Sequence, residues 1–352
     1  MITFIFTCAV QSTMAGTTWD GGDSSDNWNF NNNWNPDGSP TPGTGTDLFF
    51  GGTTRLTPYN NYGDWQNWRH IYFTSGAGSF TISGDNINIY GKIENSDDSP
   101  QSFNVNNFSY NSGSSEANPV SGDLTLGGGG SIFNNGNDVN VYGDNGHDLI
   151  ILKDLTHAGK LILQQYSVVR IATNTTYTGN TELNEGELWL EENGSISASS
   201  SVFLGNGGAT ANYCKWFIND ANGGYTFSST ITLNDGNGGI DNRTVGGLNT
   251  SGVNTYSGTI AAAGGADRTL TLFAATGGTV DYTADVTGDD KLFVAGGGIT
   301  RYSTSAKAHT GDAIVTNSST LQLNAANLIN DAVDVIVGDL LPPARGAPVG
   351  QL

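Results

Sequence analysis

Carboxylate side chains are grouped at several points of the sequence, and paired carboxylates are the groups that most glycoside hydrolases use. The densest group lies in residues 176–197, TYTGNTELNEGELWLEENGSIS. Side chains at positions i and i+2 of a strand share one face about 6.5–7 Å apart, within the roughly 5–9.5 Å between the carboxyl groups of glycosidases. Hydrolysis of a glycan is therefore the first chemistry to consider. The carboxylates concerned are Asp97, Asp98, Glu185, Glu187, Glu191, Glu192, Asp289 and Asp290.

The residues around these carboxylates favour a structural role instead. Gly186 separates Glu185 from Glu187 and indicates a turn, and no Arg or Lys is close to them in sequence. Charged side chains at turns and edges keep strands from pairing with those of other molecules. We therefore expect these groups to be solvated surface carboxylates and not an acid–base pair.

A carbohydrate-active β-helix enzyme, a polysaccharide lyase or hydrolase, is the alternative. A polygalacturonase-like site needs Asn-Thr-Asp, Asp-Asp, Gly-His-Gly and Arg-Ile-Lys segments in that order. Only Gly146-His147-Asp148 and Arg170-Ile171-Ala172 resemble parts of this set, and the Asn-Thr-Asp segment is absent. A lyase needs clustered basic groups, but the basic residues of this chain are scattered singly. We expect no catalytic residues.

Calcium is the one ion for which the sequence offers candidate ligands. The segment Asp235-Gly-Asn237-Gly-Gly-Ile-Asp241 is small and rich in oxygen ligands, as calcium-binding turns are. It occurs once, without tandem repeats and without the final Glu of an EF-hand loop, so an ordinary Asn/Gly turn is the simpler interpretation. We expect no other metal or cofactor.

Trp19, Trp28 and Trp34 stand among Asn, Asp and Gly residues near the N-terminus. Large rings of this kind can close the apolar end of a stacked-repeat protein, as a terminal capping unit must. They can also form a platform on which sugar rings stack, which would make the chain a glycan-binding module. We favour the cap.

The elements that must position these residues are short strands. The 352 residues include 50 glycines, only 13% are charged, and no window has the apolar spacing of an amphipathic helix. Runs such as Leu161-Ile-Leu163, Leu188-Trp-Leu190 and Leu270-Thr-Leu272 place two apolar residues around one outward residue, bounded by Gly, Asn or Asp. They recur over about 270 residues, further than a single sandwich core extends. The pattern predicts an all-β chain folded as a parallel β-helix, or β-solenoid, with stacked coils of about 20–30 residues.

The chain divides into four segments. Residues 1–15 are typical of a signal peptide, 16–50 form the Trp/Asn-rich cap, 51–338 form the β-helix, and 339–352 form a non-repeat tail rich in Pro and Ala. The formal net charge of −20 excludes nucleic acids and anionic membrane surfaces as partners. No other apolar run approaches the roughly 20 residues of a membrane span.

The pattern from Tyr177 to Leu190, Tyr-Thr-Gly-x-Thr-x-Leu-x-x-Gly-x-Leu-x-Leu, resembles the autotransporter-associated β-strand repeat. The segments Thr18-Trp-Asp-Gly-Gly and Asn33-Trp-Asn-Pro36 are similar to the start of such proteins, and the likeness covers about residues 17–338. The resemblance implies a right-handed parallel β-helix passenger of a Gram-negative bacterium. It brings no catalytic residues with it. The chain lacks the family's outer-membrane barrel and sorting tail, which indicates C-terminal truncation.

These observations together predict an exported, non-enzymatic β-solenoid. We expect it at the cell surface or outside the cell, in a structural or adhesive role, with glycans or other cell-surface components as partners. The run Val333–Val337 lies in the last coil. If that coil is uncapped, its open edge can pair with a second copy and produce end-to-end self-association.

Overall fold

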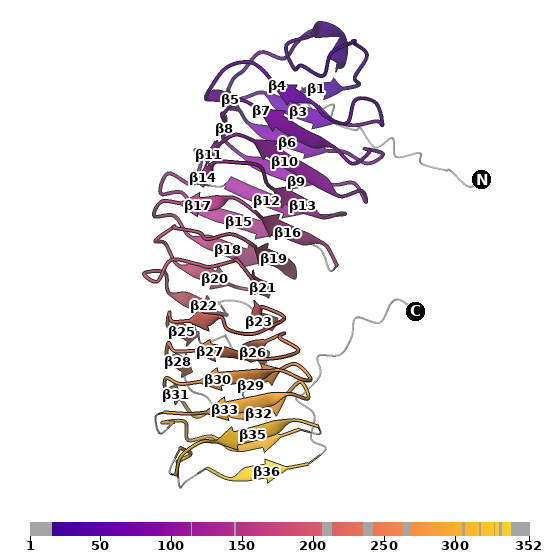
Figure 1. Ribbon diagram of the computed structural model, residues 1–352. Helices are drawn as coiled ribbons and strands as arrows, with labels where there is room; N and C mark the ends of the chain where they lie inside the picture. The colour runs from indigo at the N-terminus through magenta and orange to yellow at the C-terminus, as the bar shows by residue number, and fades with distance from the viewer. Residues whose placement is uncertain are drawn as a thin grey trace, which may run out of the picture.

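The chain folds as a β-solenoid of about 11 turns. The computed structural model describes residues 16–338, apart from 114, 144–145, 206–212, 235–241, 263–267, 305–306, 317, 327 and 331–332. Strands account for 49% of the structure, and the described residues contain no α-helix. Figure 1 shows the turns stacked as a rod, with β1 near one end and β36 at the other. The predicted all-β fold and its parallel β-helix architecture are confirmed.

Two sheets of 13 strands each run along the rod and form two of its faces. Sheet A contains, in spatial order, β2 (Trp34–Asn35), β1 (Gly16–Trp19), β3 (Asp47–Phe50), β6 (His70–Phe73), β9 (Lys92–Asn95), β12 (Ser115–Pro119), β15 (Val139–Tyr142), β18 (Leu161–Gln164), β20 (Thr181–Leu183), β22 (Val202–Leu204), β25 (Ile231–Leu233), β28 (Ile260–Ala262) and β31 (Val286–Thr287). Sheet B contains β4 (Tyr59–Asn60), β7 (Thr81–Gly84), β10 (Gln101–Val105), β13 (Leu124–Leu126), β16 (Asp148–Ile151), β19 (Ser167–Ile171), β21 (Gly186–Glu191), β23 (Tyr213–Asn219), β26 (Asn242–Gly247), β29 (Thr269–Ala274), β32 (Lys291–Ala295), β34 (Ala313–Val315) and β36 (Val335–Val337).

The third face is divided into two shorter sheets. The shorter sheet nearer the N-terminus contains β5 (Gln66–Trp68), β8 (Ile87–Ile89), β11 (Phe108–Tyr110), β14 (Ser131–Phe133) and β17 (Asp154–Thr156). The shorter sheet nearer the C-terminus contains β24 (Thr226–Phe227), β27 (Val253–Tyr256), β30 (Thr279–Tyr282), β33 (Ile299–Tyr302) and β35 (Thr320–Leu323). Between the two, the structure has an isolated bridge from Asn174 to Ser195.

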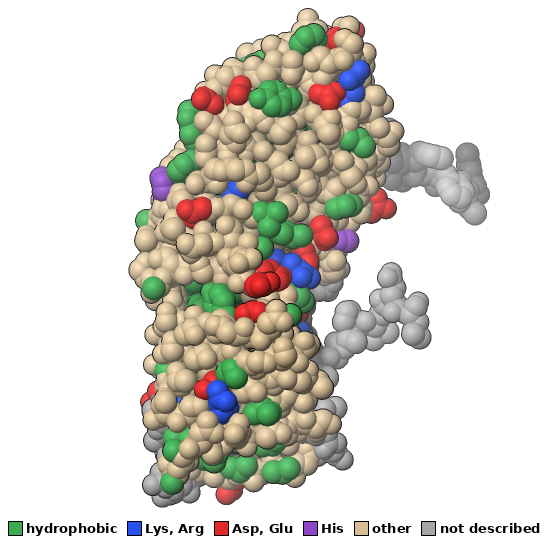
Figure 2. All heavy atoms as spheres, viewed as in Figure 1, with side chains coloured by type: hydrophobic (Ala, Val, Ile, Leu, Met, Phe, Trp, Pro, Cys, Tyr) green, Lys and Arg blue, Asp and Glu red, His purple; other side chains and the backbone are tan. Residues whose placement is uncertain are grey.

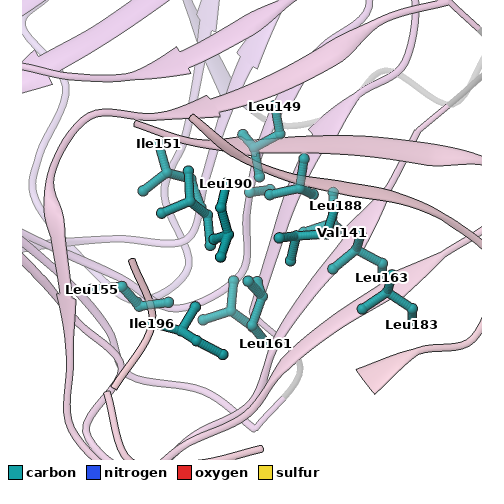
Figure 3. Packing of buried hydrophobic residues seen from close by; sticks show 14 of the residues in the cluster. Val141, Leu149, Ile151, Leu155, Leu161, Leu163, Leu183, Leu188, Leu190 and Ile196 are labelled. Atoms are coloured by element: carbon teal, nitrogen blue, oxygen red, sulfur yellow. The ribbon is translucent and has the colours of Figure 1, made fainter. Parts of the chain in front are cut away.

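Alternation of side chains along each strand builds the core. In β21, Leu188 and Leu190 are fully buried inside the solenoid, whereas Trp189 between them is half-buried on the outer face. The inward pair stacks on the same positions of the neighbouring turns, with Leu188 paired to Val169 on one side and to Trp216 on the other. Figure 3 shows this packing among Leu, Ile and Val side chains of successive turns. The prediction that Leu-x-Leu supplies inward pairs is confirmed for this segment.

The turns differ in length, which explains why the sequence has no fixed period. Stacked positions in sheet B lie 19 residues apart between Val169 and Leu188 but 29 apart between Trp216 and Val245. The strands keep their register while the corners take up the difference. Internal repeats are therefore visible as similar short segments and not as even spacing.

The N-terminal end of the rod is closed by a short reversal of the chain. After β1, a 3-10 helix, η1 (Asn31–Asn33), leads into β2, and β2 pairs antiparallel with β1. On its other side β1 pairs in parallel with β3, so the closing segment belongs to the same sheet as the coils. An antiparallel strand at this position occupies the edge that a further coil would otherwise continue.

Candidate functional site

The three N-terminal tryptophans lie inside the rod and not on its surface. Trp19, Trp28 and Trp34 are each 0% exposed. Their rings meet edge to face, with centroids 5.2 Å apart for Trp19 and Trp34 and 6.2 Å apart for Trp28 and Trp34. A sugar-stacking platform needs an exposed aromatic face, so that interpretation of these three residues is wrong. The burial is what a cap requires.

Polar contacts hold two of these rings in place. The indole N–H of Trp34 donates to the carbonyl oxygen of Trp28 at 2.7 Å, and that of Trp19 donates to the carbonyl oxygen of Arg55 at 3.1 Å. Trp28 also packs on Phe50, the last residue of β3, at 5.6 Å between centroids. Indole N–H groups lose their hydrogen bonds to water on burial, and these bonds offset part of that desolvation free energy.

The glutamate cluster of residues 185–192 lies on sheet B, and the coil register supplies the cations that the sequence lacks nearby. Strand β21 lies between β19 and β23, which places Arg170 beside Trp189 and Lys215 beside Glu187. These partners are 19 and 28 residues away along the chain. Sequence proximity could not reveal them, because neighbours in a solenoid come from adjacent turns.

Each of the two outward glutamates of β21 is held in place by such a cation. Glu187 Oε1 lies 2.6 Å from Lys215 Nζ, and its other oxygen accepts a hydrogen bond from the Trp189 indole at 3.0 Å. Glu191 lies 3.2 Å from Arg170, whose guanidinium covers the Trp189 ring at 4.3 Å. Carboxylates in ion pairs with fixed partners brace the outer face, and they are poorly placed to exchange protons with a substrate.

The remaining carboxylate pairs are also divided by the fold. Asp97 is buried and accepts backbone N–H groups of Gly76 at 2.6 Å and Ser99 at 2.9 Å. Burial acts to raise its pKa, but these hydrogen bonds outweigh it and hold the pKa below its usual 3.8. Asp290 is fully buried, whereas its neighbour Asp289 is exposed. Neither pair presents two carboxylates to one substrate.

No group of three or more His, Cys, Asp or Glu side chains that could hold a metal ion occurs among the described residues. The calcium candidates Asp235, Asn237 and Asp241 lie outside the described residues, so the calcium site stays a prediction. The signal peptide over 1–15 and the tail over 339–352 also lie outside them.

Two buried lysines, which nothing in the sequence marks as special, bind carbonyl oxygens of neighbouring turns. Lys153 donates to the carbonyl oxygens of Asn106, at 2.8 Å, and Gly129. Lys307 donates in the same way to Tyr282, at 2.8 Å, and Ala284. An isolated Lys in a polar sequence gives no sign of burial. In the solenoid each ammonium group bridges carbonyls that the corners leave without a ladder partner.

Lys153 gives the stability of the rod a defined pH dependence. Burial lowers its pKa from 10.5 to about 8, so between those values the unfolded chain holds a proton that the folded chain has lost. Stability must therefore rise with pH in this interval. We expect the free energy of unfolding of the wild type to gain about 3 kcal/mol relative to Lys153→Met across this interval. Denaturant titrations of both proteins across the interval test this, and a constant difference would contradict it.

The outer surface carries few charges for its size. In Figure 2, one face of the rod consists largely of backbone and uncharged polar side chains, with acidic and basic groups scattered in small clusters of both signs. Within the described part of the chain, no helix is long and apolar enough to cross a membrane. Comparisons of the chain with family models, curated proteins and solved structures found no match.

Proposed function

We propose that the protein is an exported, non-enzymatic β-solenoid that acts as a structural or adhesive passenger at the cell surface or outside the cell. About 11 turns, rising about 4.8 Å each, make a rod roughly 50 Å long. A continuous core of this length suits a rigid spacer. The resemblance to the autotransporter-associated repeat supports the export route.

The observation that carries this proposal is the way the outer charges are used. The two outward glutamates of β21, Glu187 and Glu191, form ion pairs with Lys215 and Arg170 of adjacent turns. Asp97 is tied to backbone N–H groups. Each of these contacts links one turn to the next. A rigid rod needs such links, whereas an acid–base site needs a carboxyl group that can exchange a proton with the substrate.

Localisation on the producing cell tests the proposal most simply. Antibodies raised against the folded protein are expected to label intact cells or to detect the protein in the medium. A cytosolic enzyme released only by lysis serves as the control for cell integrity. If the protein, like that enzyme, were detected only after lysis of the cells, export would be contradicted.

Self-association through the last coil is part of the same proposal. The side chains of β36 are exposed, with Val337 at 79%, and among the described strands β36 pairs only with β34. At the other end, β2 and the tryptophan cluster close the rod. Because β2 and the tryptophan cluster close the N-terminal end of the described rod, pairing of two β36 edges would close as a dimer and would not run on into a fibre.

Substitution of Val337 by Lys is expected to shift this equilibrium to the monomer. Two copies of the new charge would face each other across a two-fold interface, and edge lysines oppose strand pairing. Light scattering at increasing protein concentration should show the wild type approaching twice the monomer mass and Val337→Lys remaining at the monomer mass. A wild type that stays monomeric throughout would overturn dimerisation.

A further inference from the structure

The outer face of the shorter sheet nearer the N-terminus, which contains β5, β8, β11, β14 and β17, has a shallow depression of about 240 Å³. It is lined by side chains from four successive turns: two are aromatic, and the others carry amide or hydroxyl groups. The lining residues are Trp65, Asn88, Ser109, Phe133 and Asn135. None of the five is charged, in a protein whose net charge is −20.

The register of the sheet brings these residues together. Asn88 in β8, Ser109 in β11 and Phe133 in β14 are successive partners in one outward row. Trp65 stands immediately before β5, and its ring reaches across the row to meet Phe133 edge-on at 5.7 Å between centroids. Trp65 is 41% exposed, so part of its ring is available to a ligand.

A ladder of amides fixes the polar part of the depression. Asn88 donates to the carbonyl oxygen of Trp65 at 2.8 Å and accepts from Asn111 at 2.9 Å. Asn135 donates to Asn111 at 2.7 Å and to the Ser109 hydroxyl at 2.5 Å. Within the described residues, the carbonyl oxygen of the Asn135 side chain accepts no hydrogen bond, and Asn135 is exposed. This oxygen can accept a hydrogen bond from a ligand hydroxyl.

Three of the seven non-glycine residues with positive φ in the described part of the chain lie at this place. Trp65, Asn135 and His157 have φ angles of 63°, 50° and 82°, in the left-handed region that favours glycine. His157 packs against Phe133 at 5.3 Å between centroids. Strained non-glycine residues persist where the surroundings hold them, and they cluster at ligand sites. Here the strained residues are Trp65 and Asn135, which line the depression, and His157, which packs against the lining residue Phe133.

We propose that this depression binds one neutral hexopyranose unit of a glycan. The exposed face of Trp65 would cover the apolar face of the sugar ring. The N–H groups of Asn88 and Asn135 are used within the ladder, so their side-chain oxygens would accept hydrogen bonds from the sugar hydroxyls. The volume is below the roughly 300 Å³ at which pockets for drug-sized ligands begin, which suits a single ring. The inference rests on the proposed adhesive role and gives it a ligand class and a place.

Binding of neutral oligosaccharides to the purified protein tests this site. Cellohexaose and chitohexaose are titrated by calorimetry and by saturation-transfer NMR, with trigalacturonate as the charged comparison. We expect the neutral sugars to bind and Trp65→Ala to weaken their binding about tenfold. Trp189→Ala removes a tryptophan from the outer face of sheet B and is expected to leave binding unchanged. Circular dichroism and thermal midpoints establish that both variants remain folded.

The outcomes separate this site from the proposed function. Failure of both neutral oligosaccharides to bind at millimolar concentration, or equal binding by wild type and Trp65→Ala, would overturn the sugar site. Surface labelling of cells would still stand in that case, and the adhesive role would need another contact. Preference for trigalacturonate would also overturn the site, because the depression has no cation to receive a carboxylate.

Discussion

Replacement of Trp28 by alanine is expected to lower the free energy of unfolding by about 3–5 kcal/mol, the range for a buried aromatic residue. Trp28 is fully buried, and its ring packs on Trp34, Phe50 and Trp68 with centroids 5.6–6.2 Å apart. These rings come from the closing segment and from the first coils, so the cavity would open where the rod is sealed. The loss should exceed that of a typical point substitution, about 1 kcal/mol.

Trp189→Ala is the matched control for this change. Trp189 is half-buried on the outer face of β21, where it contacts Arg170 and Glu187. The loss of one cation–π contact and one hydrogen bond at the surface is expected to cost about 1 kcal/mol. Guanidinium titrations of the two variants make the comparison. Equal losses, or a larger loss for Trp189→Ala, would mean that the N-terminal tryptophans do not seal the rod.

Gly186→Ala is expected to destabilise the protein by more than about 4 kcal/mol, which is exceptional for a single methyl group. Gly186 has a φ of 116°, and a Cβ atom there would lie 2.2 Å from the carbonyl oxygen of Ser167. Ser167 is the stacked partner of Gly186 in β19. The obstructing atom belongs to the backbone of the adjacent turn, so relief requires β19 and β21 to separate.

Gly224→Ala isolates the part of this effect that comes from the φ angle alone. Gly224 has a φ of 110°, but no heavy atom lies within 4 Å of its added Cβ. Its replacement should cost only the conformational strain, about 1–3 kcal/mol. The difference between the two variants in denaturant titrations therefore measures the close approach of the two turns. If Gly186→Ala proves no worse than Gly224→Ala, β19 and β21 do not approach each other at this position as described.

The solenoid could be predicted from the sequence because its core depends on local alternation. Leu161-Ile-Leu163 and Leu188-Trp-Leu190 are inward pairs in the structure as in the prediction. The lengths of individual turns could not be predicted, since corners of very different length join strands that remain in register. The absence of a fixed period likewise concealed which strands stack on which.

Candidate site residues were harder to judge than strands. The composition around Trp28 is polar, so sequence alone left both a cap and a sugar platform open, and burial decided between them. The sequence did not indicate a role for Trp65, although its ring is exposed beside an amide ladder. The signal that could have found it is the outward position of Asn67, Asn88 and Ser109 at similar points of three successive strands, but recognising it required the register.

The acidic segment with which the sequence analysis began has a structural explanation. Its outward glutamates alternate with inward leucines, and the cationic partners of Glu191 and Glu187 come from adjacent turns, 21 and 28 residues away. An isolated window shows only the negative half of each pair. The same reasoning applies to other solenoids, in which clustered charge of one sign should be assessed only after the turns are aligned.

Incubation of the purified protein with polysaccharides tests the central claim, a scaffold without a catalytic centre, most directly. Neutral glucans and acidic polygalacturonate are each incubated with and without Ca²⁺, followed by chain-length analysis and detection of unsaturated uronate products. We expect every polysaccharide to keep its length and neutral chains to be retained by immobilised protein. Shortened chains or unsaturated products that disappear in Glu187→Gln would contradict it, because the outer carboxylates would then be catalytic.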